Sequence, residues 1–334
     1  MPARSAFRIV FRALFALIAT LAAVPTAAQS GLVGRDVPIC IAPARPGDTA
    51  AAMLRADRRY DCTRAQTSFG AGDFWVRSAP LSTRAWAVRS GSLWQDEATL
   101  YIVYGDGVVL SQRMNGHDAT RAIRLGAILE RALPAREAPV TRLMWHVRGA
   151  ANLRGIVLAP HLATARESVR SDMLLGALYS AFGGLCLALL IYNLALWGAL
   201  RHGFQLAYCA MVAGLMLYAF SSSGAMAWVF PGLENNDRLR INYAMLSIAA
   251  VCALAFARSF FGAHVFKGWL ARASDIVAAL LLVAATALVV LAPWRITLLD
   301  HIYAVSFVAL IALVPFILWR AWRDRSNYLW IYTI

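Results

Sequence analysis

The stretch LLGALYSAFGGLCLALLIYNLALWGALRH, from Leu174 to His202, is the first apolar run in the chain that is too long for a soluble core. No residue between Met173 and Leu200 is charged. At about 1.5 Å per residue, a helix of this length crosses the roughly 30 Å hydrocarbon layer of a bilayer and leaves some length for tilt. We therefore expect this span to separate an exported part of the chain, before it, from a membrane-bound part, after it.

The composition requires much of the chain to face lipid. Of the 334 residues, 60% are hydrophobic and 15% are charged, and the mean hydropathy is +0.57. An ordinary soluble globule carries about a quarter charged residues. The net charge of +14 is spread along the whole chain, which argues against a nucleic-acid-binding patch. We therefore expect membrane lipid, and no nucleic acid, among the partners.

The N-terminus has the pattern of a secretory signal. Arginines precede an apolar run over residues 13–24, and small residues end at Ala28. This pattern predicts a signal peptide over residues 1–28 that is cleaved after Ala28. An uncleaved anchor is the alternative, although the apolar run is short for a span. In either case we expect the chain from Gly31 onward to leave the cytoplasm.

Residues 29–170 have the texture of an all-β domain, with short β-branched and aromatic runs between Gly, Pro, Asp and Asn residues. Regular spacing of such runs predicts an antiparallel, jelly-roll-like sandwich. A helix over residues 48–59, with Asp48 as its N-cap, is expected as an insertion outside the core. The expected strands are Val37–Ala42, Phe74–Leu81, Arg84–Arg89, Thr99–Tyr104, Val108–Met114, Thr141–Val147 and Gly155–Leu158.

Aromatic rings and guanidinium groups gather on neighbouring expected strands. In FWVRSAPL, from Phe74 to Leu81, apolar and polar positions alternate, so this strand is expected to bury one face and expose the other. A sheet face with flat rings and planar donors can stack a sugar or clamp a carboxylate. The alternative is that the rings are core and the arginines solvated. The candidate ligand-binding residues are Trp75, Arg77, Trp86, Arg89, Trp94, Tyr101 and Tyr104.

The cysteines and histidines point to a disulfide and to no metal site. Cys40 and Cys62 lie in the exported part, where an oxidising compartment favours a disulfide between them, with two buried thiols as the alternative. The histidines have no spacing to cysteines or carboxylates that is typical of a metal site. No nucleotide-binding loop, kinase signature or Gly-x-Ser-x-Gly elbow occurs, so we expect neither a cofactor nor enzyme activity in this chain.

Further apolar runs follow the first span closely. A helix that ended inside lipid at Ile334 would leave backbone carbonyls unsatisfied, so we expect the chain to be truncated there, or its last residues not to insert. The region 171–334 is therefore expected to form a polytopic helical membrane bundle. Its spans are expected near residues 173–200, 204–220, 239–261, 276–291 and 298–319, with a sixth that begins near residue 327.

A few polar residues interrupt these spans. Tyr192 and Asn193 lie in the first span, and we interpret them as packing residues whose amide needs a partner across the bundle, with a ligand site as the alternative. Asp300 and His301 open the fifth span beside Arg295 and are expected to be solvated at the outer interface, with a proton relay as the alternative. A short polar junction, Thr164–Asp172, precedes the first span; it transmits a displacement only if it is ordered.

Basic residues give an orientation that is independent of the signal. If the N-terminal domain lies outside, the outer loops hold Arg238 and Arg295, with Arg240 just inside a span. The inner loops then hold Arg201, Lys267, Arg272, Arg320, Arg323 and Arg325. This distribution agrees with the positive-inside rule and with an exported N-terminal domain.

Several motifs recur in an order that resembles a known family. The membrane part contains YNLALWGALRHGFQLAYCAMVAG at Tyr192–Gly214, SSSGAMAWVFPG at Ser221–Gly232 and FARSFFG at Phe256–Gly262. The exported part contains DFWVRSAPL followed by TLYIVYGDG. Together they resemble the bacterial seven-transmembrane receptors with diverse intracellular signalling modules (7TMR-DISM), whose extracellular domain is a jelly-roll-like sandwich similar to carbohydrate-binding modules.

The resemblance implies a receptor in the bacterial inner membrane with a periplasmic sensor domain. Such a receptor senses a small molecule or carbohydrate-like ligand and regulates a cytoplasmic domain or partner, typically a GGDEF diguanylate cyclase, a histidine kinase, an adenylate cyclase or a phosphatase. The sequence departs from the family at its end, where spans six and seven and any effector are missing, and a homodimer is left open. A transporter or permease subunit with an exported domain is the alternative, but these spans hold few polar residues of the kind that transporters place at the membrane midplane.

Overall fold

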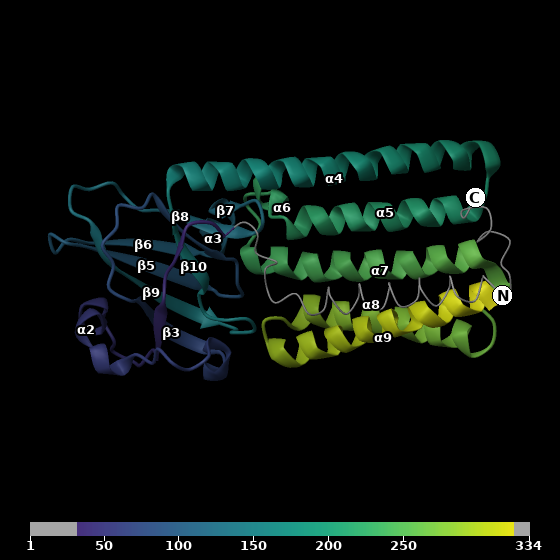
Figure 1. The fold of residues 1–334 in the computed structure, drawn as a ribbon. Helices are drawn as coiled ribbons and strands as arrows, with labels where there is room; N and C mark the ends of the chain where they lie inside the picture. Colours follow the sequence, from purple (N-terminus) through teal and green to yellow (C-terminus); the bar gives the residue numbers. More distant parts are fainter. Residues whose placement is uncertain (1–31, 324–334) are drawn as a thin grey trace, which may run out of the picture.

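A computed structural model describes residues 32–323. The expected signal peptide and the start of the sixth span at residue 327 lie outside the described residues. The chain forms a β-sandwich and a bundle of long helices that extends from one side of the sandwich (Figure 1). This arrangement confirms the predicted fold class, an all-β sandwich followed by an α-helical polytopic bundle.

Two five-stranded sheets form the sandwich, and every strand pairs with its neighbours in antiparallel fashion. The first sheet has the order β1-β10-β4-β8-β7, made of Arg35–Asp36, Leu158–Ala163, Ala87–Gly91, Ile128–Ala132 and Ile123–Arg124. The second sheet has the order β2-β3-β9-β5-β6, made of Ile39–Pro43, Gly72–Ser78, Val140–Ala150, Glu97–Tyr104 and Val109–Asn115.

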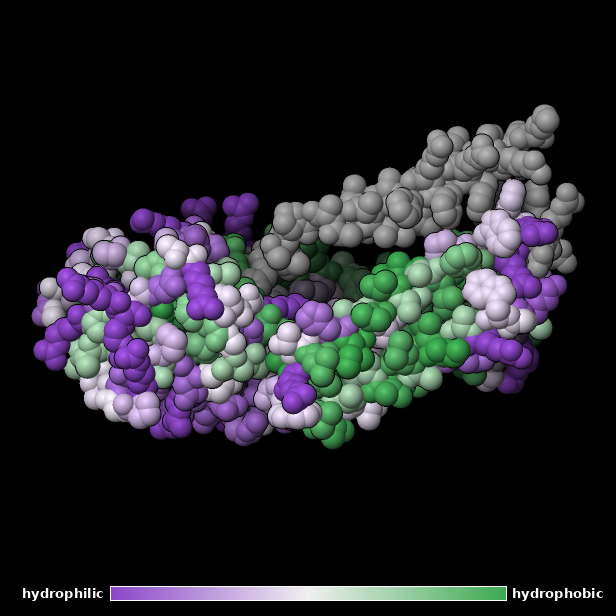
Figure 2. Space-filling model, turned by 90° about the horizontal axis from the view of Figure 1, so that it is seen from below, coloured by the Kyte–Doolittle hydropathy of each residue, from purple (hydrophilic) through white to green (hydrophobic). Residues whose placement is uncertain are grey.

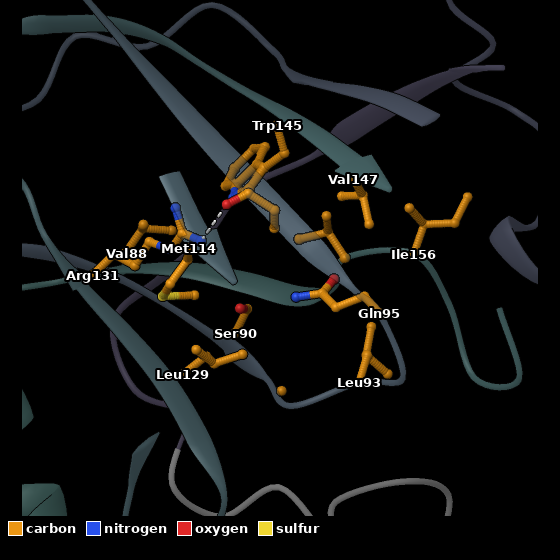
Figure 3. A pocket seen from close by; sticks show the side chains of 13 residues that line it. Val88, Ser90, Leu93, Gln95, Met114, Leu129, Arg131, Trp145, Val147 and Ile156 are labelled. Carbon is orange, nitrogen blue, oxygen red and sulfur yellow. Dashed lines mark hydrogen bonds between the residues drawn. The ribbon is translucent and has the colours of Figure 1, made fainter. Parts of the chain in front are cut away.

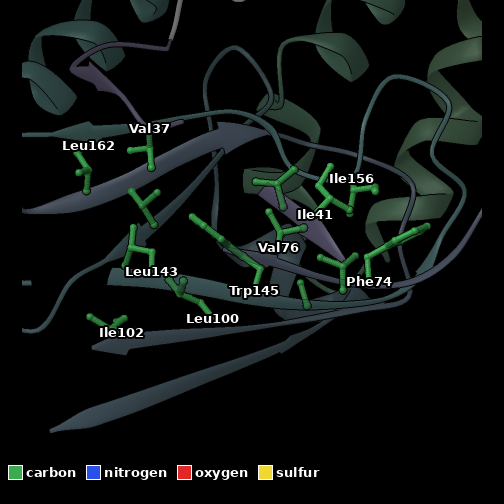
Figure 4. Close-up of a cluster of buried hydrophobic side chains, with 14 of the residues drawn as sticks. Val37, Ile41, Phe74, Val76, Leu100, Ile102, Leu143, Trp145, Ile156 and Leu162 are labelled. Carbon is green, nitrogen blue, oxygen red and sulfur yellow. The ribbon is translucent and has the colours of Figure 1, made fainter. Parts of the chain in front are cut away.

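The main core lies between the two sheets (Figure 4). Successive side chains of a strand point to opposite faces, so alternate residues of β5 and β9, such as Leu100 and Leu143, enter this core. They meet Val88 and Leu162 of the facing sheet. The sandwich therefore owes its stability to the period-two pattern that the sequence shows.

The face of β3 that was expected to be exposed is buried, so this prediction is wrong. The helix α2, Ala50–Arg55, and the segment after it cover the outer face of the second sheet, and Met53 and Tyr60 pack near Trp75 there. The side chain of Thr49, and not Asp48, caps α2 by accepting from the Ala52 N–H. The Cys40–Cys62 disulfide is confirmed, and it ties this insertion to β2.

Two strand predictions fail for identifiable reasons. Gly155–Leu158 is not a strand, because the Gln66 side chain holds the Ile156 and Val157 amides and β10 begins only at Leu158. The strand β8 was missed because its polar residues interrupt the apolar pattern. The helix α3, Gly116–Arg121, occupies a predicted turn, where Asn115 forms a capping box with Asp118.

Five helices in the described residues are long and apolar enough to cross a membrane, as the sequence predicted. The loop between α5 and α7 contains the short helix α6, Ala225–Val229. On the face of the bundle that Figure 2 shows, hydrophobic residues gather between the polar ends. The long helices are α4 (Ala165–Leu200), α5 (Gly203–Ser222), α7 (Asn235–Val265), α8 (Trp269–Leu291) and α9 (Ile296–Arg323).

Candidate functional site

The predicted ligand-binding residues on the second sheet make internal contacts. Trp75 is 2% exposed, and its ring stacks on His146 with 4.1 Å between ring centroids, while the Tyr101 ring lies 6.0 Å away at an angle of 33°. Arg77 is buried, donates to the Asp57 carboxylate at 2.6 Å and lies over the Tyr60 ring. These rings and this guanidinium already have partners within the protein.

The remaining predicted residues lie elsewhere. Tyr104 is buried and donates to the Pro134 carbonyl at 2.6 Å, whereas Trp86 is 52% exposed. Arg89 and Trp94 lie where the sandwich meets the helices. The structure thus divides the set among separate places, and a ligand role for these residues stays a prediction.

The interior of the sandwich has room for little more than water. A pocket of about 30 Å³ lies between the sheets, lined among others by Val88, Trp145 and Arg131 (Figure 3). The Arg131 guanidinium donates to the Ala98 and Gln112 carbonyls at 2.9 and 2.8 Å, and burial lowers its pKa to about 10. A water needs about 10–15 Å³ by the same kind of measure, so this pocket does not hold a larger ligand.

The first contact between sandwich and bundle is a buried ion pair network. Arg89 of β4 is fully buried and donates to Glu130 of β8 at 2.8 Å and to Asp172 of α4 at 3.0 Å. Arg124 also contacts Glu130 at 3.3 Å. An unpaired charge at such a buried position is costly, so the three groups hold β4, β8 and α4 together.

The junction to the first span is helical from its first residue. Thr164 caps α4 in a capping box with Glu167, directly after β10 ends at Ala163. The polar junction predicted at Thr164–Asp172 is therefore ordered and continuous with the membrane-spanning part of α4. A displacement of β10 has a rigid path into this helix.

The second contact is made by the loop that contains α6. The Ser223 carbonyl accepts from the Gly126 and Ala127 amides at 2.7 and 3.2 Å, and the Trp228 indole donates to the Ile123 carbonyl at 3.0 Å. Ala227 packs in a small cluster with sandwich residues of β6, α3 and β8. The motif that was expected only as an outer loop thus docks onto the sandwich.

The third contact joins the start of α7 to the loop after β4. Arg238 is 1% exposed and donates to the Ser92 hydroxyl at 2.8 Å, while the Asn235 amide donates to the Leu93 carbonyl at 2.9 Å. Arg238 forms no ion pair with any residue from 32 to 323. Its guanidinium group donates only to neutral oxygens within this part of the chain.

A cavity of about 360 Å³ lies beside these contacts, between the sandwich and the helices. Trp94 and Arg154 line it from the sandwich, and Tyr243, Asp300 and Tyr303 line it from α7 and α9. The Tyr243 hydroxyl donates to the Asp300 carboxylate at 2.8 Å. A second cavity of about 170 Å³ shares Arg154 with the first and is also lined by Arg238.

Sequence reasoning missed most of this junction. Asp172, Glu130 and Arg238 are charges beside or within apolar stretches, and that position was the only signal available. The polar pair in the first span differs from the expectation as well, because the Asn193 amide donates to Leu189 of its own helix at 2.9 Å and Tyr192 is 62% exposed. No group of metal-binding side chains occurs among the described residues.

The comparisons with known proteins bear on the helices of this junction. Residues 175–334 match the family described as 7TM diverse intracellular signalling, which is the membrane part of 7TMR-DISM receptors. No curated protein matches the sequence. The family match covers α4 from Leu175 onward and the helices α5 to α9, which include the docking loop around α6 and the start of α7, whereas Asp172 of α4 lies just before it. Residues 175–334 are therefore similar to the membrane part of 7TMR-DISM receptors, and the β-sandwich that precedes them is consistent with such a receptor.

Proposed function

We propose that this chain is an inner-membrane receptor whose β-sandwich lies in the periplasm and reports the binding of a small molecule to a cytoplasmic output. The observation that carries the proposal is the Arg89 network, which fixes α4 to the sandwich by ion pairs at 2.8 and 3.0 Å. A flexible tether would isolate the two parts from each other, whereas this junction has no linker. The output is a cytoplasmic module such as a diguanylate cyclase or histidine kinase.

The charge distribution supports the orientation. The α4, α7 and α9 helices run away from the sandwich, so their C-terminal ends lie at the far end of the bundle (Figure 1). Arg201, Lys267 and Arg320 are at that end, and Arg320 donates to the Lys267 carbonyl. The positive-inside rule then favours the cytoplasm for the far end and the periplasm for the sandwich.

A ligand acts on such a system only if it binds two states of the protein unequally. The sandwich contacts α4 through Arg89, the α6 loop through Gly126, and α7 through Ser92. These helices occupy different places in the bundle (Figure 1). A rotation or shift of the sandwich therefore moves them by different amounts, which is a rigid-body mechanism of the kind that switches many receptors. The match of residues 175–334 to a signalling family favours this mechanism over the transporter or permease subunit that the sequence left open.

Cysteine labelling tests the orientation. In a chain without the free cysteines Cys186, Cys209 and Cys252, a membrane-impermeant maleimide should label Ser111→Cys in the sandwich of cells with a permeabilised outer membrane. It should label Arg272→Cys, at the far end of the bundle, only after the inner membrane is opened. The reverse pattern would refute the orientation.

Distance measurements test the coupling. Spin labels at positions 201 and 272, both at the far end of the bundle, report how α4 lies relative to α8 in the full chain in lipid nanodiscs. Asp172→Asn should shift this distance distribution, because it weakens the bond between sandwich and α4. Asp106→Asn, which alters a surface pair with Arg136, is the matched control and should leave it unchanged. Identical distributions in all three proteins, or substrate uptake by vesicles that carry only this chain, would overturn the receptor proposal.

A further inference from the structure

We propose that the cavity between the sandwich and the helices is a binding site for a small zwitterion with an apolar body, of the amino acid or dipeptide class. Binding at this site does not depend on the proposed function; only the signal that binding would produce rests on it. Its chemistry follows from charges that face the cavity and have no ionic partner in the described part of the chain. Both parts of the protein supply such charges.

The cavity has the size and the walls of a ligand site. Its volume of about 360 Å³ falls within the roughly 300–1,000 Å³ of typical small-molecule pockets. Leu93, Trp94 and Leu153 form its wall on the sandwich side, and Leu246 and Phe307 form part of the wall on the helix side. An apolar body is therefore accommodated between two apolar walls that belong to different parts of the protein.

Asp300 supplies the negative end. Its carboxylate accepts from the Tyr243 hydroxyl at 2.8 Å and forms no ion pair with any basic residue from 32 to 323. Two basic residues at this end of the bundle have other partners, since Arg240 pairs with Asp237 and Arg295 lies over the Trp294 ring. The rings of Tyr243 and Tyr303 meet edge to face at 4.9 Å beside it.

A carboxylate next to aromatic rings can bind an ammonium group. The carboxylate provides a charge-assisted hydrogen bond, and a ring face attracts a cation within about 6 Å of its centroid. Trp94 adds a third ring to this wall, with its centroid 6.4 Å from that of Tyr243. The cation of a ligand is therefore expected at the α9 side of the cavity.

Arginines supply the positive end. Arg154, in the loop between β9 and β10, is exposed, lines both cavities and forms no ion pair within residues 32–323. Arg238 is buried, lines the smaller cavity and bonds only to the neutral oxygens of Ser92, Asn235 and Ser221. A ligand carboxylate in the larger cavity would pair with the Arg154 guanidinium, a group whose planar donors suit a carboxylate, while Arg238 adds positive charge beside the smaller cavity.

The two ends together exclude simpler ligands. An amine without a carboxylate would leave Arg154 without an ionic partner, and an anion without an amine would leave Asp300 without one. A zwitterion gains a charge-assisted hydrogen bond at both ends. A neutral sugar would satisfy neither end as well.

Such a ligand would also act on both parts of the protein at once. Arg154 belongs to the sandwich, whereas Asp300 belongs to α9. A bound zwitterion therefore connects the β9–β10 loop to a helix that the Arg89 network does not touch. Differential contact of this kind is what a ligand needs to shift a two-state equilibrium.

Binding to the full chain in lipid nanodiscs tests the proposal. L-phenylalanine and glycyl-L-phenylalanine are the two zwitterionic probes, and they distinguish the amino acid from the dipeptide source. The controls are 2-phenylethylamine, which lacks the carboxylate, and 3-phenylpropionate, which lacks the amine. We expect saturable heat in calorimetry and a rise in melting temperature with at least one zwitterion, and affinities lower by about tenfold or more for both single-charge analogues.

Two variants test which residues bind the ammonium and carboxylate groups of the ligand. Asp300→Asn keeps an acceptor for Tyr243 but should weaken zwitterion binding about tenfold and remove its advantage over 3-phenylpropionate. Arg154→Gln should do the same relative to 2-phenylethylamine, and both residues have few structural contacts to lose. Arg295→Gln is the matched control, because this arginine lies at the same end of the bundle but lines neither cavity.

The outcomes separate the site from the proposed function. If neither zwitterion binds, or if the analogues and the variants bind equally well, the site proposal is wrong while labelling and distance measurements still test the receptor. If a zwitterion binds as expected but the distance between positions 201 and 272 does not respond to it, the site stands and the signalling proposal fails.

Discussion

Asp172→Asn should release the first turns of α4 from the sandwich without unfolding either part. The wild-type carboxylate accepts from the fully buried Arg89 at 3.0 Å and is itself largely buried, with 21% of its side chain exposed. The asparagine side chain retains an acceptor but no charge. Arg89 keeps its second carboxylate, Glu130, at 2.8 Å, so the sandwich retains its own ion pair.

The magnitude follows from what the substitution removes. A hydrogen bond between two charged groups contributes about 1.5–3 kcal/mol, and one with a neutral acceptor contributes about 0.5–1.5 kcal/mol. The difference, about 1–2 kcal/mol, is the expected loss in the free energy that holds α4 against β4. A loss of this size raises the population of the released state by about 5- to 30-fold.

Hydrogen–deuterium exchange of the full chain in nanodiscs measures this population. The amides of residues 168–174, in the second and third turns of α4, should exchange about 5- to 30-fold faster in the variant, while those of β3 and β9 stay unchanged. Asp275→Asn is the control, because it breaks the exposed Arg258–Asp275 pair at the far end of the bundle. Exchange within twofold of wild type at residues 168–174 would refute the idea that this ion pair couples the two parts.

Three further predictions concern the sandwich and its docking loop. Gly224→Ala should loosen α6 and expose residues 225–229 to proteases, because Gly224 has φ +84° and an added Cβ would lie 2.8 Å from the Arg124 carbonyl oxygen. The expected loss in stability exceeds about 1 kcal/mol, whereas the control Gly232→Ala, in open space, should have no effect. Replacing both Cys40 and Cys62 by serine should destabilise the sandwich by about 3 kcal/mol, since their disulfide closes a 22-residue separation; thermal unfolding without reductant measures this, and Cys252→Ala serves as the control. Burial lowers the pKa of His146 below its ordinary value of 6.5, so the unfolded chain binds a proton at higher pH than the folded chain, and the stability of the sandwich should be complete above about pH 6.5 and fall as the pH decreases through it. A His146→Gln variant should show a flatter dependence of melting temperature on pH between pH 7 and 5. This effect is distinct from the loss of stability near pH 4 and below that the lowered pKa values of Asp48, Asp61 and Asp106 predict. An equal slope in the variant and the wild type would contradict the assignment to His146.

The elements with a clean hydrophobic period were predictable. The five membrane helices follow from apolar runs of sufficient length, and β5 and β9 follow from period-two alternation around Leu100 and Leu143. The helices extend beyond the predicted spans because their polar ends, such as Asn235–Arg238 in α7, continue the helix outside the apolar run. Hydropathy marks the part of a helix that faces lipid and not the positions where the helix begins and ends.

The failures occur where one element covers another. Trp75 and Arg77 lie on a face of β3 that the alternating sequence pattern predicts to be exposed to solvent. This face is buried because α2 packs against it in the folded protein. Likewise β8 carries Glu130 and Arg131, whose charged side chains predict solvent exposure, although partners far away in the sequence bury both side chains. Local patterns carry no information about such partners, which is why the ion pair between Arg89 and Asp172 was not foreseen.

The distribution of burial along α4 explains how the junction can act on the bundle. Near the sandwich, Ser168, Ser171 and Leu175 of α4 are buried, whereas no residue from Leu187 to Leu200 is. The helix is thus held firmly at its sandwich end and packs loosely along its second half, where α5 is its main neighbour among residues 32–323. A rigid rod that is fixed at one end and weakly packed at the other converts a small rotation at the fixed end into a larger displacement at the free end. The α7, α8 and α9 helices share a buried cluster at their far end, around Leu254, Leu270 and Ile317, and so resist the same motion. A signal that enters through Arg89 should therefore appear at the far end of the bundle as a movement of α4 relative to these three helices.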